Sequence, residues 1–221
     1  MVSLVPEILA RVDGVDVLVV DDNSGDGTAE FLKYTSRHES RLFYLIRDQK
    51  AGLGSAYVDG FRWALRHGYE NIAQMDADYS HRITDLQMMF EAKGAHDFVI
   101  GSRRVYGSRT LNWSRSRRLL SWIANQYVNF FLGPKISDWT GGFNIWSAKV
   151  LNSIELDATQ ARGFIFQADI KFRALKLNFS AIEVPIIFEE RREGQSKMSF
   201  RIIAEGLAHV WRLGSIFSHS S

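Results

Sequence analysis

Short apolar runs alternate with helix-like segments along the first hundred residues of the chain. The runs are rich in β-branched residues and end at polar or glycine-bearing positions, which is typical of buried strands. Strands are expected over residues 15–20, 42–46, 71–75 and 97–101, and helices over 28–37, 55–67 and 84–93. This alternation predicts right-handed βαβ units, and therefore an α/β fold with a Rossmann-like, mostly parallel sheet covered by helices on both faces.

The pattern changes beyond residue 104. Residues 114–132 predict a long helix with an apolar, aromatic side and arginines at its start, which is typical of an amphipathic helix at a membrane interface. The remaining expected elements are a strand over 143–146, a helix over 164–177, a β-run over 181–188 and a final helix over 200–213. The sequence contains neither an internal repeat nor a domain linker, so we expect one domain over residues 1–221.

Composition narrows the class of protein. The chain has 221 residues, of which 46% are hydrophobic and only three are proline, and this excludes a disordered or collagen-like chain. It has no cysteine, which excludes disulfides, zinc–thiolate sites and thiol nucleophiles and suits the reducing cytoplasm. Glu7 and Arg11 interrupt the apolar start, and no apolar run reaches about eighteen residues, so neither a signal peptide nor a membrane span is expected.

The net charge of +2 hides a cluster of arginines in a stretch of sixteen residues that contains no acid. Its members are Arg103, Arg104, Arg109, Arg115, Arg117 and Arg118. A solvated basic face is one interpretation. Nucleic acid is disfavoured because the cluster is local and the whole chain is nearly neutral. The aromatic, amphipathic segment beside it favours an anionic membrane surface, where each arginine contributes about 1 kcal/mol.

Three polar clusters, over residues 21–26, 76–80 and 102–104, directly follow predicted strands. The carboxyl ends of parallel strands meet at one edge of a sheet, where ligands bind in folds of this kind. The sequence therefore predicts a single site built from three separate pieces of chain.

Asp76 and Asp78 flank one alanine at the end of a strand, so both carboxylates can face one hard cation while a diphosphate supplies further oxygens. Mg²⁺ or Mn²⁺ fits this donor set. Two solvated turn aspartates are the plain alternative. A phosphatase with an aspartate nucleophile is a rival, but its motif would follow the first strand.

Two further polar segments have both a functional and a structural interpretation. The turn over residues 21–28 offers carboxylates and backbone donors to sugar hydroxyls and base edges, or is an Asx-turn followed by a threonine cap. The loop over 194–199 places Lys197 where a lid would close on phosphate, or is a plain surface loop. His81 and His209 show no metal-ligand spacing and are interpreted as structural or solvated.

Taken together, six ordered motifs resemble one family. They are the segments 21–28, 52–57 (Gly-Leu-Gly-Ser-Ala-Tyr), 75–78 (Met-Asp-Ala-Asp), 101–103 (Gly-Ser-Arg), 112–113 (Asn-Trp) and 196–199 (Ser-Lys-Met-Ser). They resemble the dolichol-phosphate and polyprenol-phosphate mannose synthases, and above all the bacterial polyprenol monophosphomannose synthases of glycosyltransferase family two. The likeness covers nearly the whole chain, from about Leu4 to Leu213.

The resemblance implies a GT-A fold, a GDP-mannose donor, a divalent metal and a polyprenyl or dolichyl phosphate acceptor at the cytoplasmic membrane face. It assigns Asp21 and Asp22 to the nucleotide, with Asp22 on the nucleoside. It assigns Asp76 and Asp78 to the metal and diphosphate, and Arg103 to the phosphates. It assigns Lys197 to the donor pyrophosphate or acceptor phosphate, and matches Asp169 to an acidic position on the active-site helix.

The implied reaction agrees with these residue types. A phosphate monoester is already anionic, so its oxygen can attack the sugar carbon without a strong protein base, and the configuration inverts in one displacement. The protein then has to align the two substrates and neutralise the leaving diphosphate. The alternatives are a related enzyme that uses another nucleotide sugar, such as a glucose donor, and an inactive nucleotide-binding remnant.

The chain departs from the family pattern in three places. It begins inside the helix that follows the family's first strand, whose Pro-Thr-Tyr-Asn-Glu-like motif helps to hold the nucleotide, so we expect the natural start about twenty residues upstream by analogy with the family. Ser80 stands where several relatives have a glutamine near the metal. No membrane span follows Leu213, so we expect peripheral attachment, with a separate membrane-anchoring protein as a further candidate partner.

Overall fold

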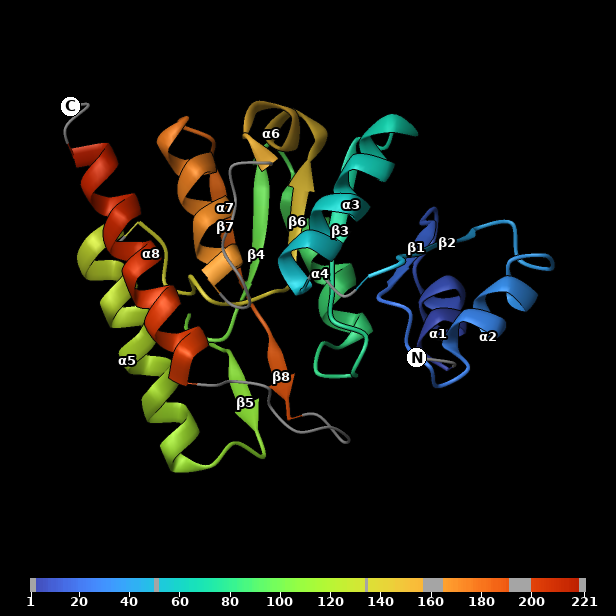
Figure 1. The fold of residues 1–221 in the computed structure, drawn as a ribbon, viewed down its shortest axis with the longest axis horizontal. Coiled ribbons are helices and arrows are strands. Elements are labelled where there is room, and N and C mark those ends of the chain that lie inside the picture. Colours follow the sequence, from blue (N-terminus) through green and yellow to red (C-terminus); the bar gives the residue numbers. More distant parts are fainter. Residues whose placement is uncertain (1–2, 50–51, 134, 157–164, 191–199, 219–221) are drawn as a thin grey trace. The chain divides into compact units, whose positions relative to one another are not determined.

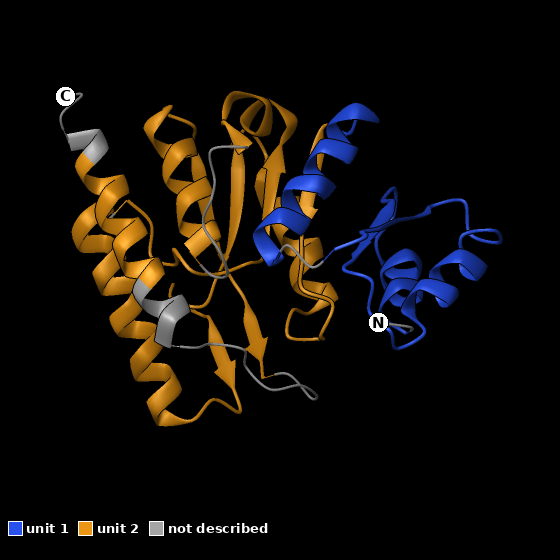
Figure 2. Cartoon of the chain, in the orientation of Figure 1, with its two compact units in different colours: residues 1–69 blue, residues 70–221 orange. Residues whose placement is uncertain are grey.

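The computed structural model describes residues 3–49, 52–133, 135–156, 165–190 and 200–218 (Figure 1). The chain divides into two compact units, Met1–Tyr69 and Glu70–Ser221 (Figure 2). Each unit contains strands and helices of its own.

The first unit is a two-stranded parallel sheet with three helices. Its elements are α1 (Leu4–Arg11), β1 (Val17–Asp21), α2 (Thr28–Thr35), β2 (Leu42–Ile46) and α3 (Leu53–Arg66). Val17 pairs with Leu42 and Asp21 with Ile46, so the predicted parallel pairing of the two strands is confirmed. The helix expected over 55–67 begins earlier, after Gly52, whose φ of +93° is a conformation that side chains other than glycine rarely adopt.

The second unit is built on a four-stranded sheet in the order β3-β6-β4-β7. Its strands are β3 (Asn71–Gln74), β4 (Phe98–Ser102), β6 (Asn144–Ser147) and β7 (Ala181–Pro185), and its helices include α4 (Ile83–Lys93), α6 (Ala148–Ser153) and α7 (Ile165–Lys176). β4 and β7 are parallel, whereas β6 is antiparallel to both β3 and β4. The sheet is therefore mostly parallel by strand direction, as predicted, with one reversed strand inserted.

The β-run predicted over residues 181–188 is two strands. β7 pairs with β4, and the chain then bends at Ile186, whose N–H donates to the Ser102 carbonyl at 3.1 Å. Beyond the bend, β8 (Ile187–Glu189) pairs in parallel with β5 (Arg109–Leu111). Pro185 ends β7, which fits its inability to donate a ladder hydrogen bond.

Two long helices, α5 (Arg115–Leu132) and α8 (Phe200–Ser218), lie side by side in the second unit (Figure 1). The Tyr127 hydroxyl donates to the Leu207 carbonyl at 2.9 Å. The helices approach closely at Gly214, where a Cβ would stand 2.8 Å from the Phe131 carbonyl oxygen. Across the part of the chain that the structure describes, no helix combines the length and hydropathy that crossing a membrane requires.

Candidate functional site

Asp76 and Asp78 lie in a turn just beyond the carboxyl end of β3. The Asp78 carboxylate accepts a hydrogen bond from the Ser80 N–H at 3.0 Å. Tyr79, which lies between Asp78 and Ser80, adopts a positive φ of 61°. The Asp76 N–H donates to Nδ1 of His81 at 3.1 Å. These local bonds fix the backbone of the turn that carries both carboxylates.

His81 is a structural part of the site. Its ring is buried, stacks on Phe143 with centroids 4.5 Å apart and meets the edge of Phe188 at 5.3 Å. Because Nδ1 accepts a backbone hydrogen bond, that nitrogen carries no proton. Burial lowers the pKa of His81, against the opposing charges of Asp76 and Asp78, and this keeps the ring neutral.

The donor set suits a hard divalent cation. Mg²⁺ is commonly held by one or two carboxylates together with substrate phosphates and waters, and Asp76 and Asp78 provide two carboxylates on one turn. Among the described residues, no group of three or more His, Cys, Asp and Glu side chains gathers at one point. The pair is thus suited to a cation that arrives with a diphosphate.

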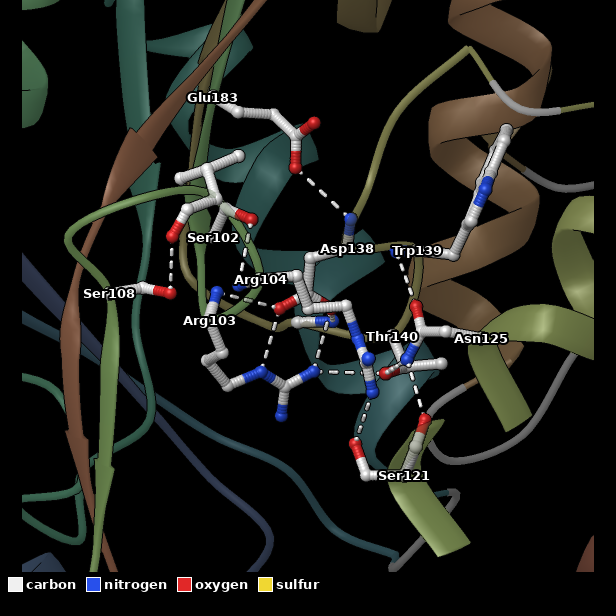
Figure 3. A network of polar contacts seen from close by, with 12 residues as sticks. Ser102, Arg103, Arg104, Ser108, Ser121, Asn125, Asp138, Trp139, Thr140 and Glu183 are labelled. Atoms are coloured by element: carbon white, nitrogen blue, oxygen red, sulfur yellow. Dashed lines mark hydrogen bonds and ion pairs between the residues drawn. The ribbon is translucent and has the colours of Figure 1, made fainter. Parts of the chain in front are cut away.

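Arg103 follows β4 and is held in a fixed orientation (Figure 3). Its Nε donates to Asp138 Oδ2 at 2.7 Å and its Nη2 to Asp138 Oδ1 at 2.7 Å, a bidentate pair in which the Asp138 side chain is fully buried. Nη2 also donates to the Thr140 hydroxyl at 2.9 Å. The remaining nitrogen, Nη1, points away from Asp138 (Figure 3).

Asp138 is ionised in this environment. Burial alone would raise the pKa of its carboxyl, but the charge and hydrogen bonds of Arg103, together with the charge of Lys171, hold that pKa well below its ordinary value. The Arg103 and Gly141 N–H groups also donate to the carboxylate, at 3.0 and 2.9 Å. The carboxylate is therefore saturated by donors from two separate segments.

Two charged groups hold the loop that carries Asp138, the partly buried Glu183 and the fully buried Lys171. Glu183 of β7 accepts from the Ser137 N–H at 2.7 Å and from the Asp138 N–H at 3.0 Å, the second of which Figure 3 shows. Lys171 of α7 donates from Nζ to the carbonyl oxygens of residues 138 and 141, at 2.9 and 2.8 Å. Burial lowers the pKa of Lys171 to about 8.

Sequence reasoning missed Asp138, Lys171 and Glu183. The polar residues and paired glycines over 137–142, directly before a strand, were the available signal. Nothing in the pattern of α7 distinguishes Lys171 from a solvated lysine, because its partners are backbone carbonyls from a distant segment.

Other members of the arginine cluster also take part in the fold. Arg104 Nη2 donates to the Ser121 hydroxyl at 3.0 Å (Figure 3). The Arg117 guanidinium lies 4.7 Å from the centre of the Trp113 ring and pairs with Glu190. The interpretation of the cluster as a uniform solvated face is therefore wrong for these positions. Arg115 and Arg118 at the start of α5 are exposed.

Asp169 of α7 is fully buried and is held by two partners. Its Oδ1 accepts from Arg173 Nε at 2.6 Å, and its Oδ2 lies 2.9 Å from His209 Nε2 on α8. Because a carboxylate only accepts, the His209 nitrogen is the donor. The structure thus places Asp169 between two helices of the second unit, and its role in the reaction stays a prediction.

Asp21 and Asp22 lie in the first unit, at the carboxyl end of β1. Asp21 accepts from the N–H and hydroxyl of Ser24. The predicted Asx-turn is found at Asp26, whose carboxylate accepts from the Thr28 N–H at 3.1 Å, but the predicted threonine cap is wrong because Gly27 is the N-cap of α2. Asp22 pairs with Arg47 Nη1 at 2.7 Å, and the same arginine also pairs with Asp59 at 3.1 Å. The nucleotide-binding role of the two aspartates stays a prediction.

The structure brings several of the predicted residues of the second unit together. Charges of Asp76, Asp78 and Arg103, with that of Asp138, all act on the buried ring of His81, which lies among them. Lys197 lies outside the described residues, so its predicted role is neither supported nor contradicted.

Comparison with known proteins identifies the relatives of this chain. Residues 6–154 match the family model described as glycosyl transferase family 2. The chain is 43% identical over 199 residues to an undecaprenyl-phosphate mannosyltransferase of Micrococcus luteus, which covers 90% of this chain and 82% of that protein. It is 42% identical over 215 residues to a polyprenol monophosphomannose synthase of Mycolicibacterium smegmatis, which covers 95% of this chain and 81% of that protein.

Solved structures resemble the fold. Glucosyl-3-phosphoglycerate synthase from Mycobacterium tuberculosis, in complex with Mn²⁺, uridine-diphosphate-glucose and glycerol 3-phosphate, superposes with a TM-score of 0.63 at 16% identity. The match covers 95% of this chain and 72% of that one. The same synthase in complex with phosphoglyceric acid gives a TM-score of 0.62, over 88% of this chain and 68% of that one. At this identity the likeness concerns the fold, and it confirms the predicted fold class.

Proposed function

The chain belongs to glycosyl transferase family 2, and we propose that it transfers mannose from GDP-mannose to a polyprenyl or dolichyl-type phosphate. The observation that carries this proposal is the 42–43% identity, over 90–95% of the chain, to two named proteins. One is an undecaprenyl-phosphate mannosyltransferase and the other is a polyprenol monophosphomannose synthase. The carboxylate pair beyond β3 and the fixed guanidinium beyond β4 are what such a transfer needs in order to neutralise a leaving diphosphate.

In this proposal Asp76 and Asp78 hold Mg²⁺ or Mn²⁺. A bound divalent cation supplies charge that stabilises the leaving diphosphate. The two carboxylates lie on a turn whose backbone is fixed by Ser80 and His81, so little reorganisation is needed when the cation and donor arrive. The fold is shared with a synthase whose structure was determined with Mn²⁺ and a nucleotide sugar, which supports dependence on a divalent metal.

Arg103 contributes a fixed positive charge to the phosphates. Asp138 and Thr140 occupy two of its nitrogens and lock the guanidinium plane, which leaves Nη1 as the nitrogen available to a phosphate oxygen. We assign Asp22 and Asp21 to the nucleotide, Lys197 to the donor pyrophosphate or acceptor phosphate, and Asp169 to the active-site helix, as the family resemblance implies.

The acceptor's own charge explains the absence of a strong base from this proposal. The phosphate monoester oxygen attacks the anomeric carbon of mannose, the bond to the donor diphosphate breaks, and the configuration inverts. Positioning and fixed charge then account for the rate enhancement.

We propose peripheral attachment to the cytoplasmic face of the membrane, and the surface of α5 and α8 supports the attachment itself. Six large apolar side chains on these two helices are about half exposed or more: Leu119, Leu120, Trp122, Ile123, Phe130 and Trp211. The inward side of α5 is instead formed by Asn125, Val128 and Leu132. Exposed Arg115 and Arg118 at the start of α5 add attraction to anionic lipid headgroups. A separate membrane-anchoring protein is a further proposed partner.

The test is transfer of labelled mannose from GDP-mannose to polyprenyl phosphate in detergent, with and without Mg²⁺ or Mn²⁺. We expect metal-dependent transfer by the wild type and loss of it in Asp76→Asn and Asp78→Asn, because each change removes a charged metal ligand. Thermal unfolding without metal serves as the folding control.

A panel that includes UDP-glucose and GDP-glucose as donors tests the sugar and the nucleotide separately. Turnover by Asp76→Asn equal to that of the wild type would exclude the proposed metal site. Transfer of glucose but not mannose by the wild type would overturn the proposed donor.

A further inference from the structure

Three buried amide side chains form a continuous chain of hydrogen bonds in the core of the second unit. Gln74 of β3, Asn144 of β6 and Gln167 of α7 are each at most 2% exposed. Asn144 Nδ2 lies 3.2 Å from Gln74 Oε1 and 3.2 Å from Gln167 Oε1. At the far end, the indole Nε1 of Trp146 donates to Gln74 Oε1 at 3.2 Å.

The indole sets the direction of every amide in this chain. An indole N–H only donates, so Gln74 has to turn its oxygen toward Trp146. Asn144 then turns its Nδ2 toward that oxygen, because its own oxygen would be repelled there, and Nδ2 also faces the Gly141 carbonyl at 3.4 Å. Gln167 must in turn present its oxygen to Asn144, and this directs its Nε2 group the other way.

The Nε2 group of Gln167 is buried and has no hydrogen-bond partner among the described residues. An unsatisfied buried donor is destabilising, because it loses its hydrogen bonds to water without replacement, and native proteins rarely keep one without a reason. Flipping the amide would not relieve this cost, because it would place Nε2 against the Asn144 Nδ2 donor.

Gly142 shows what this donor faces. A Cβ built on Gly142 would stand 3.5 Å from Gln167 Nε2 and 3.8 Å from both carboxylate oxygens of Asp76. Gly142 therefore lies against both an unpaired amide donor and a carboxylate of the candidate site, and its lack of a side chain leaves the two groups without a Cβ beside them.

We propose that Gln167 is a specificity-determining residue whose Nε2 donates to a hydroxyl oxygen of the donor's sugar. This inference rests on the proposed function, because it takes a nucleotide sugar as the ligand. A hydroxyl satisfies both neighbours: it accepts from Gln167 and donates to Asp76. An ionised phosphate oxygen is less suitable beside Gln167, because it carries no proton and could accept from Gln167 but not donate to Asp76.

Two variants test the proposal through binding. Gln167→Met keeps the volume of the side chain but removes the amide. Gly142→Ala places a methyl group beside Gln167 Nε2 and Asp76, where it has no contact shorter than 3.5 Å and where Gly142 has no positive φ, so we expect it to fold. The matched control is Gln126→Met, at an exposed glutamine on α5. Thermal unfolding of each variant checks the fold.

The measurement compares the affinity for the nucleotide sugar with the affinity for the free nucleoside diphosphate by calorimetry. We expect Gln167→Met to weaken GDP-mannose binding roughly tenfold, which corresponds to about 1.4 kcal/mol, and to leave GDP binding unchanged, because the lost hydrogen bond affects only the sugar. Gly142→Ala should likewise weaken GDP-mannose more than GDP. Gln126→Met should change neither affinity.

Monodeoxy analogues of GDP-mannose identify the hydroxyl. The analogue that lacks the contacted hydroxyl should bind wild type and Gln167→Met equally, whereas the other analogues should keep the tenfold difference. Equal losses for every analogue, or no loss for GDP-mannose, would overturn the assignment of Gln167 and leave the proposed function intact.

The donor panel separates the two hypotheses. If the wild type binds another nucleotide sugar in place of GDP-mannose, the proposed donor fails, and the same comparison on that sugar still decides the role of Gln167. If the wild type binds no nucleotide sugar at all, both the proposed function and this inference are refuted.

Discussion

Lys171→Met removes a buried ammonium group that ties α7 to the loop carrying Asp138. The Lys171 side chain is fully buried, and its Nζ donates to two loop carbonyls at 2.8 and 2.9 Å. Burial is the main cause that lowers its pKa from 10.5 to about 8, opposed by the charge of Asp138. In the unfolded chain the lysine regains its ordinary pKa of 10.5. The folded and unfolded states therefore bind different numbers of protons at pH values between about 8 and 10.5.

The sign of the effect follows from that difference. Below about pH 8 the lysine is protonated in both states, and the cost of burying its charge is fully present. Between pH 8 and 10.5 the unfolded chain binds more protons than the folded protein, so the free energy of unfolding rises with pH. At about 1.4 kcal/mol per pKa unit, the shift contributes about 2 kcal/mol by roughly pH 9.5.

Urea denaturation at pH 7.5 and at pH 9.5 measures this contribution. We expect Lys171→Met to lack the rise of about 2 kcal/mol that the wild type shows. The matched control is Lys176→Met, at an exposed lysine on the same helix, which should keep the wild-type dependence. If wild type and Lys171→Met gain equally between the two pH values, then Lys171 does not titrate near pH 8 in the folded protein and the reasoning fails.

Two further predictions concern the membrane and the buried ion pair. Charge reversal of the exposed Arg115 and Arg118 together should release the protein from anionic liposomes in a sedimentation assay while GDP-mannose binding stays unchanged, and unaltered liposome binding would contradict the proposed surface. Asp138→Asn should lower the free energy of unfolding in urea by about 3–5 kcal/mol and raise the KM for GDP-mannose, because it leaves the largely buried Arg103 without its charged partner. A loss below about 1 kcal/mol with an unchanged KM would show that the pair holds neither the loop nor the guanidinium.

Local pattern was sufficient for most of the secondary structure and for the carboxylate pair. Strand runs such as residues 42–46 and 97–101 are apolar, of strand length and bounded by turn residues, and the structure places strands at Leu42–Ile46 and Phe98–Ser102. Asp76 and Asp78 follow a strand directly, so their position at its carboxyl end needed only the strand itself. The order of motifs along the chain was likewise enough to indicate the family that the comparisons confirm.

The direction of β6 and the bend between β7 and β8 were beyond the reach of pattern. β6 pairs with a strand on each side, and its hydrophobic pattern does not indicate whether it runs parallel or antiparallel to them. Its orientation depends on how the chain returns to the sheet after α5. The bend at Ile186 depends on a hydrogen bond to Ser102, which is brought there only by the pairing of β7 with β4.

The sequence by itself determined the elements, the carboxylate pair and the family, because these depend on neighbouring residues and on motif order. Only the tertiary structure decided that Arg103 is locked by Asp138, that Lys171 is buried under the same loop, and that the unpaired donor of Gln167 lies beside Gly142 together with the Asp76 carboxylate. These features rest on polar groups from distant segments meeting where water is excluded. In that environment each donor and acceptor must find its partner within the fold or in a ligand.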